Sequence, residues 1–268
     1  MTTKSMGRLL GHVAVLAVSI VTLSGCDVMV GMGGFGGKEL AKDQWRRTYP
    51  LAAGGQLDIV NVNGSIVTEA TDGTVVDVVA ERSARAGTLE AAKDLLQGIQ
   101  MREETAPARV SIEVKPPSGF GGSTNVDFVV KVPRNAVLRL LNSNGKITIV
   151  GAQGSIRAEV TNGGVTGRGL AGAVDASTTN GSISVDMDTV AGDGIRLGTT
   201  NGSIQLALPA SARAEIRASC VNGGVSATNL NLEHRGTQSR RRLDGTLNGG
   251  GSRIVLDTTN GGIKIMGK

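Results

Sequence analysis

The hexapeptide Thr-Thr-Asn-Gly-Ser-Ile occurs twice in the chain, at residues 178–183 and 199–204, and the variant Thr-Thr-Asn-Gly-Gly-Ile stands at residues 258–263. From Asn144 onward the Asn-Gly pairs follow one another at spacings of 18, 18, 21 and 21 residues, and then of 38, about two periods. A fixed period of this length is typical of proteins built from stacked repeats. The repeat corners are Asn63, Gly64, Asn144, Gly145, Asn162, Gly163, Asn180, Gly181, Asn201, Gly202, Asn222, Gly223, Asn260 and Gly261.

The residues that flank each Asn-Gly pair alternate between apolar and polar. Around Asn201, for example, Ile195 and Leu197 precede the corner and Ile204 follows it. An alternation of period two predicts a half-buried strand on each side of the corner. Asn and Gly suit the corner because both tolerate a positive φ, and because Asn can also bond its own backbone.

Two chain paths fit this pattern. Asn-Gly between alternating segments is the strongest short signal for a β-hairpin, so an antiparallel meander is one of them. The other is a parallel solenoid, and we favour it because the same residue class returns to the same slot in each repeat, as in-register stacking requires. Only 2% of the residues are aromatic, which suits a narrow interior filled by aliphatic side chains. The sequence therefore predicts an all-β fold, a parallel β-solenoid of ~18–21-residue coils with one short helix near its N-terminal part.

The N-terminal segment has the features of a secretory leader. Lys4 and Arg8 precede the mostly apolar stretch 9–23, which is short for a membrane-spanning helix. The segment ends in Leu-Ser-Gly-Cys26, which resembles the lipobox of bacterial lipoproteins. The resemblance implies a lipoprotein signal peptide at residues 1–25 and a lipidated Cys26 that begins the mature chain. The Gly-rich residues that follow predict a tether over 26–44, and residues 45–268 form the expected β-solenoid domain.

These features together resemble the bacterial putative-adhesin family of β-strand-repeat envelope proteins. The residues that carry the resemblance are the lipobox, the Asn-Gly-Ser-Ile corners, and the segment Val126-Asp-Phe-Val-Val-Lys-Val-Pro133, which precedes an apolar strand. The resemblance covers roughly residues 45–268. It implies a β-solenoid without an established biochemical activity or agreed catalytic residues.

A long interval between Asn63 and Asn144 departs from the repeat. Within it, Thr88 is a candidate cap for a helix over residues 89–101, inside an insertion at about 88–101. Leu89, Ala92 and Leu96 fall on one face of this helix. We expect the helix to cover the N-terminal end of the solenoid, where edge groups would otherwise be unpaired. An amphipathic helix that binds a partner is the alternative.

The second departure is a basic irregular loop at about residues 232–247. Its Arg235, Arg240, Arg241 and Arg242 could contact an anion such as a phosphate headgroup, an envelope polymer or an acidic protein. A solvated loop extruded from one coil is the other interpretation, and the sequence leaves both open.

The residues that chemistry would need are scarce. The sequence holds two His and two Cys, and no pair has the spacing of a zinc site. It lacks a P-loop motif, so we expect no metal and no cofactor. Asp186 and Asp188 share strand parity and, with Asp193, are the only carboxylate group that suggested polysaccharide chemistry. Solvent-facing positions explain them equally well, and Cys220 fills a small buried slot beside a corner.

The sequence therefore predicts a non-enzymatic, lipid-anchored protein of the bacterial cell envelope that faces the periplasm or the cell exterior. Its expected partners are the membrane, through the anchor, and an unidentified envelope protein or glycan. Nucleic acid is excluded because residues 26–268 carry a side-chain charge of only +3, and because an envelope location separates the protein from it. Two alternatives remain open: an accessory component of envelope-stress signalling, and a β-helix enzyme that acts on an envelope polysaccharide.

Overall fold

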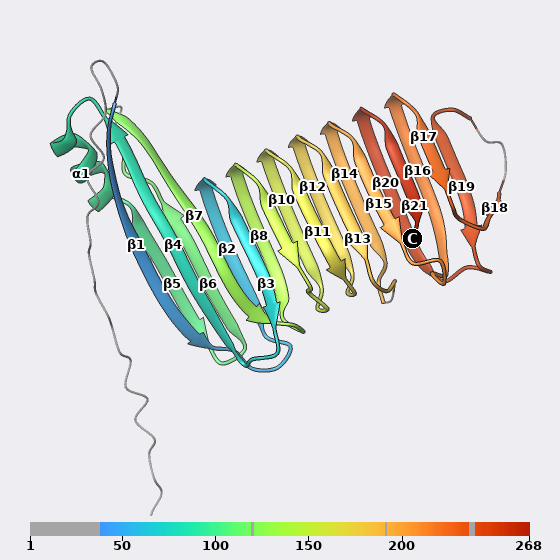
Figure 1. The fold of residues 1–268 in the computed structure, drawn as a ribbon, viewed down its shortest axis with the longest axis horizontal. Helices are drawn as coiled ribbons and strands as arrows, with labels where there is room; N and C mark the ends of the chain where they lie inside the picture. The colour runs from blue at the N-terminus through green and yellow to red at the C-terminus, as the bar shows by residue number, and fades with distance from the viewer. Residues whose placement is uncertain (1–37, 119–120, 191, 236–238) are drawn as a thin grey trace, which may run out of the picture.

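The chain folds into two long β-sheets that lie face to face and are connected at every coil. The computed structural model describes residues 38–118, 121–190, 192–235 and 239–268. Sheet A contains ten strands in the order β1-β4-β7-β3-β9-β11-β13-β15-β21-β17, and sheet B eleven in the order β18-β19-β16-β20-β14-β12-β10-β8-β2-β6-β5. Figure 1 shows the stack running from the blue N-terminal end to the red C-terminal end.

Seven coils form the regular part of the stack. In each coil a strand of sheet B ends at the corner asparagine, and a strand of sheet A begins three residues after it. The sheet B strands are β2 (Gln56–Asn63), β8 (Val137–Asn144), β10 (Ile156–Asn162), β12 (Val174–Asn180), β14 (Ile195–Asn201), β16 (Ala214–Asn222) and β20 (Ser252–Asn260). Their sheet A partners along the chain are β3 (Ile66–Thr71), β9 (Ile147–Val150), β11 (Val165–Leu170), β13 (Ile183–Met187), β15 (Ile204–Leu208), β17 (Val225–Thr228) and β21 (Ile263–Gly267).

These coils pair in parallel and in register, so the predicted solenoid is confirmed and the hairpin meander is excluded. Asn162 pairs with Asn144 on one side and with Asn180 on the other. Likewise Ile183 pairs with Val165 and with Ile204. A slip by one residue would turn the buried side chains of a strand outward, so the alternation in the sequence determines the register.

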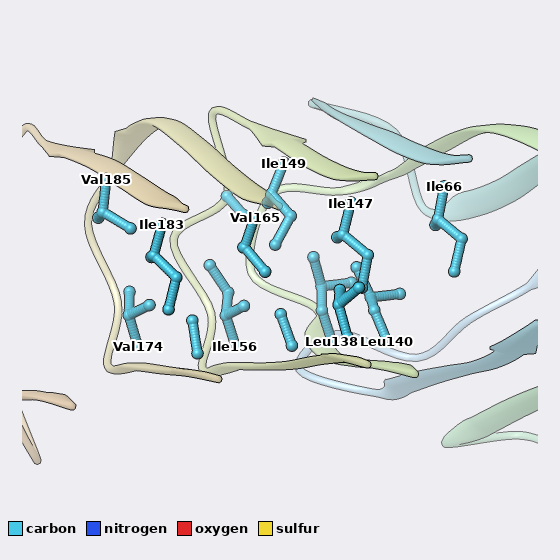
Figure 2. Packing of buried hydrophobic residues seen from close by; sticks show 14 of the residues in the cluster. Ile66, Leu138, Leu140, Ile147, Ile149, Ile156, Val165, Val174, Ile183 and Val185 are labelled. Carbon is cyan, nitrogen blue, oxygen red and sulfur yellow. The ribbon is translucent and has the colours of Figure 1, made fainter. Parts of the chain in front are cut away.

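The core is a continuous column of aliphatic side chains between the sheets. Figure 2 shows Ile147, Val165 and Ile183 on one side and Ile156 and Val174 on the other, pointing toward one another. All five are buried, with at most 3% of each side chain exposed. The aliphatic slots of the sequence pattern are therefore the interior of the solenoid.

The order of the coils in space differs from their order in the chain. The last coil, β20–β21, lies between β14–β15 and β16–β17, so it separates two coils that are consecutive in the sequence. The chain reaches this position through β18 (Leu232–His234) and β19 (Arg242–Leu247), which are antiparallel to one another, while β19 is also antiparallel to β16. The segment predicted as an irregular loop at 232–247 is therefore partly wrong, because these strands extend sheet B and end it.

The N-terminal end is built differently from the central coils. In sheet A three twelve-residue strands, β1 (Glu39–Pro50), β4 (Val75–Ala86) and β7 (Gly122–Pro133), pair antiparallel. In sheet B, β5 (Gln100–Ala106) pairs antiparallel with β6 (Arg109–Lys115). Since β1 begins at Glu39, the predicted tether at 26–44 is wrong over its last six residues, which pair with β4.

The single predicted helix is present but shorter than expected. It is α1 (Leu89–Gln97), and the Thr88 side chain accepts a hydrogen bond from the Ala91 N–H, as a helix cap should. The helix ends at Gly98, and residues 100 and 101 already belong to β5. It links sheet A to sheet B at the N-terminal end and packs against β1, β4 and β7. The edges at this end of the two sheets are β1 and β5, so antiparallel strands, rather than the helix, pair with the end coil.

Candidate binding surface

The corner asparagines form one ladder along the solenoid. The Nδ2 of each donates to the Oδ1 of the next, in the order 222, 260, 201, 180, 162, 144 and 63, over distances of 2.7–2.9 Å. Most of the amides are exposed to solvent. Each rung uses one of two N–H bonds and one of the oxygen's lone pairs, so the ladder leaves further donors and acceptors facing outward.

The corner glycines are required mainly by the close approach of neighbouring coils. A Cβ on Gly181 would lie 1.9 Å from the Gly163 carbonyl oxygen, and one on Gly202 would lie 1.8 Å from the Gly181 oxygen. Gly163 also has a φ of +148°, but a positive φ is not found at every corner. The sequence argument from backbone conformation is therefore incomplete, because contact with the neighbouring coil excludes a side chain even where φ is extended.

A second row lies two residues before each corner and ties each coil to its neighbour. The hydroxyls of Thr178, Thr199 and Thr258 donate to the corner glycine carbonyls of the adjoining coil, at 2.7, 2.9 and 3.0 Å. Val160 and Cys220 fill the same slot in other coils and are 5% and 7% exposed. The predicted location of Cys220, in a small buried slot, agrees with this placement.

A shallow groove with a volume of about 740 Å³ runs across these coils on the outer side of sheet B. Twelve of its nineteen lining residues carry a hydroxyl or a carboxamide, and only Glu159 and Asp257 are charged. Glu159 accepts a hydrogen bond from Arg157, and Asp257 accepts one from Ser219. The groove is therefore a nearly neutral, hydrogen-bonding surface that repeats at the strand spacing of ~4.8 Å.

The four arginines predicted as an anion contact all lie at the C-terminal end of the stack and are exposed. Arg235 forms an ion pair with Glu215, and Arg242 forms one with Asp244, which also pairs with Arg217. The hydrogen bond from Arg242 is the main reason why the pKa of Asp244 lies below its ordinary value.

The backbone of this basic segment closes the stack. The Cys220 N–H donates to the Arg241 carbonyl, and the Val225 N–H donates to the Arg240 carbonyl. In the central coils the equivalent N–H donates to a carbonyl of the next coil. The Ile204 N–H, for example, donates to the Gly262 carbonyl. The segment therefore substitutes for a further coil, which the interpretation as an extruded loop does not explain.

The three aspartates considered for sugar chemistry are not brought together. Asp186 and Asp188 both bond to the Lys268 ammonium group, at 2.5 and 3.0 Å, whereas Asp193 lines a separate hollow with Arg196 and Arg253. The hydrogen bond from Lys268 to Asp186 raises the pKa of the lysine. Across the described ranges 38–118, 121–190, 192–235 and 239–268, no group of His, Cys, Asp or Glu could hold a metal ion. Residues 1–37, including Cys26, lie outside the described part of the chain.

The sequence did not predict two features of the surface: the hydrogen bonds of two buried amides, and a valine in place of a corner glycine. Asn61 and Asn142 occupy the buried slot before the corner, and their Nδ2 atoms donate to the carbonyls of Val126 and Gly64. Val126, inside β7, takes the place of a corner glycine, because its carbonyl oxygen would lie 2.1 Å from a Cβ on Gly64 and accepts a hydrogen bond from Asn61. The sequence there reads Asn125-Val126 rather than Asn-Gly, and only the parallel pairing of Ile66 with Phe128 makes its match to Asn63-Gly64 recognisable.

Comparison with known proteins gives the family of the repeat region. Residues 138–266 match the family model described as Toastrack DUF4097. The Toastrack region thus begins at β8 and covers the coils that carry most of the ladder. No curated protein sequence matches the chain.

The solved structures that match this chain have low TM-scores and low sequence identity to it. A putative cell adhesion protein from Clostridium sporogenes has a TM-score of 0.47 and 10% identity, over 85% of this chain and 100% of that one. A putative adhesin from Bacteroides fragilis has a TM-score of 0.28 and 12% identity, over 84% and 97% of the two chains. A putative lipid binding protein from Parabacteroides distasonis has a TM-score of 0.20 and 11% identity, over 84% and 96%. Among the described residues, no helix is long and apolar enough to cross a membrane.

Proposed function

We propose that this protein is a non-enzymatic binding module of the bacterial cell envelope, anchored through lipid on Cys26. The groove on sheet B carries the proposal. It crosses the coils at right angles to the strands, and each coil adds hydroxyl and amide groups of the same kind. A surface of this type suits an extended partner that lies along the stack, because the same contacts recur at every coil.

The chemistry of the groove favours a polar, uncharged partner. Thr161, Thr179 and Thr200 are exposed in its walls, beside the outward-facing amides of the asparagine ladder. Hydroxyls and carboxamides both donate and accept hydrogen bonds, so they match a polyhydroxylated chain such as an envelope glycan. Catalysis on such a chain would need an acid and a base aimed at one bond, and the only two carboxylates in the groove are already hydrogen-bonded.

Photo-crosslinking in the native host tests the binding surface. A photoreactive residue at Thr179 lies in the groove, whereas one at Ser184 lies on the outer face of sheet A as the matched control. We expect glycan or protein adducts at Thr179 and none at Ser184. Equal adducts at both positions, or none at Thr179, would contradict a binding role for the groove.

Replacement of Cys26 tests the anchor separately. We expect the wild-type protein to incorporate labelled palmitate and to sediment with membranes, and the Cys26→Ser variant to lose the label. A wild-type protein that takes up no label would disprove the anchor while leaving the groove experiment valid.

A further inference from the structure

The charge of the described chain is concentrated at one end. Residues 38–208 carry seventeen Lys and Arg against eighteen Asp and Glu, whereas residues 209–268 carry nine against four. Residues 209–268 contain β16 to β21, which lie at the end of the stack opposite β1 and α1 (Figure 1). The solenoid is therefore almost neutral along most of its length and has a net charge of +5 at its C-terminal end.

The basic cap, defined as Arg235, Arg240, Arg241 and Arg242, is held in place by its backbone. The carbonyls of Arg240 and Arg241 accept hydrogen bonds from the β16–β17 coil, and Ser239 and Arg242 are paired through both N–H groups. Ordering these side chains against a partner thus costs less entropy than ordering a free loop.

Two members of the basic cap are available to an external anion. Arg235 and Arg242 are engaged with Glu215 and Asp244. The Arg240 and Arg241 side chains are exposed, and neither forms an ion pair within the described ranges. A guanidinium group binds phosphate oxygens through two parallel N–H bonds. Because the side chains lie at the outer end of the stack, a flat surface of many phosphates can reach both at once.

We propose that the basic cap binds the phosphate headgroups of an anionic lipid bilayer. This inference deepens the proposed function, because an acyl anchor on Cys26 would already hold the chain at a bilayer. Ten strand spacings of ~4.8 Å make the solenoid roughly 48 Å long, and the twelve residues between Cys26 and Glu39 can extend to roughly 40 Å. The tether is thus long enough for the solenoid to lie along the membrane, attached by lipid at one end and by the basic cap at the other.

The experiment uses the full chain as the native host produces it, mixed with vesicles of phosphatidylcholine with or without phosphatidylglycerol. An environment-sensitive fluorophore on Asn231→Cys reports docking of the capped end, since Asn231 is exposed beside β18 and Cys220 is buried. Co-flotation with pure phosphatidylcholine reports the anchor alone. We expect a fluorescence change only with phosphatidylglycerol, and its loss at high salt.

The Arg240→Ala/Arg241→Ala double variant should weaken docking roughly thirtyfold, since each arginine near an anionic surface contributes roughly a fivefold step. Arg139→Ala/Arg196→Ala is the matched control. It removes the same charge from exposed positions on sheet B that form no ion pair within the described ranges, and should change docking less than twofold. An equal loss of docking in both variants, or docking that does not depend on phosphatidylglycerol, would overturn the proposal.

Two further readouts separate the sources of the signal. Inorganic phosphate at matched ionic strength should leave docking unchanged. Loss of docking in phosphate would mean that the basic cap binds a single phosphate group rather than a bilayer, and would overturn the proposal. Failure to float with phosphatidylcholine would disprove the anchor, but the dependence on phosphatidylglycerol would still test the basic cap.

Discussion

The central coils and the N-terminal end differ in how neighbouring strands pair and pack against one another. In the centre, parallel strands stack so closely at each corner that glycine carbonyls fill the space a Cβ would need. At the N-terminal end, long antiparallel strands carry the pairing, and Val126 stands where the coils have glycine. A Cβ on Gly64 would lie 2.1 Å from the Val126 carbonyl, so each glycine makes room for the neighbour on its N-terminal side. Val126 has no further Asn-Gly coil on that side. Glycine is thus a requirement of stacking, not of the corner alone.

The largest expected effect comes from the shared interior of the coils. Ile204 is fully buried, whereas Gln205 is exposed on the other side of the same strand. Ile204→Asp places a charge without a partner among aliphatic side chains, and we expect it to abolish folding, with a loss of roughly 4 kcal/mol or more. Gln205→Asp should change stability by about 0.5 kcal/mol or less. Equal unfolding midpoints in a urea titration would contradict the register.

A glycine substitution tests stacking directly. Gly181→Ala should cost about 3 kcal/mol, because its methyl group would collide with the Gly163 backbone. The matched control is Gly198→Ala in β14, where a Cβ meets nothing within 4 Å, and stability should stay within about 0.5 kcal/mol. Thermal unfolding followed by circular dichroism measures both. A harmless Gly181→Ala would mean that the corners separate easily and that close approach does not explain the glycines.

The asparagine ladder should show a difference between its interior and its end. Asn180 both donates to Asn162 and accepts from Asn201, whereas Asn63 only accepts, from Asn144. We expect Asn180→Ala to cost about 1 kcal/mol and Asn63→Ala about half of that, since exposed hydrogen bonds contribute modestly. Chemical denaturation resolves this difference, and a larger loss at Asn63 would show that the rungs do not act independently.

The smallest predicted effect is a gain in stability. Val160 occupies in its coil the position that Thr178 occupies in the neighbouring coil. The Thr178 hydroxyl donates from that position to the Gly163 carbonyl. Val160→Thr should place a hydroxyl beside the Gly145 carbonyl and stabilise the protein by about 0.5 kcal/mol. Val165→Thr serves as the control and should destabilise it by about 1 kcal/mol or more, because Val165 is buried between Ile147 and Ile183 in the register. A loss of stability in Val160→Thr would refute the proposed role of the threonine row.

Much of the regular fold could be predicted, and the ends could not. The alternation of apolar and polar residues around Asn201 and Asn180 shows which side chains face the core. The strands, the corners and the parallel stacking could be predicted from this local pattern. The irregular ends depend on pairings between segments far apart in the chain. Nothing in the sequence of β18 and β19 indicates that they pair with β16, because their side chains do not repeat the coil pattern.

The binding surface divides in the same way. The basic cap and the asparagine corners could be located from composition and spacing, since charge and repetition are visible along the chain. The groove could not, because it exists only where the strands of several coils lie side by side. Its buried asparagines at 61 and 142 resembled ordinary variation of the slot that Thr178 fills in other coils.

The sequence by itself determined the repeating unit, its register and its preference for aliphatic interiors, because these depend on interactions within a coil and between identical coils. Only the tertiary structure decided which coil lies next to which. The corners at Asn201, Asn222 and Asn260 are so alike that each could stack on either of the others. The pairing of β16 with β19 on one side leaves its other side for β20, and thereby inserts the last coil of the chain inside the stack.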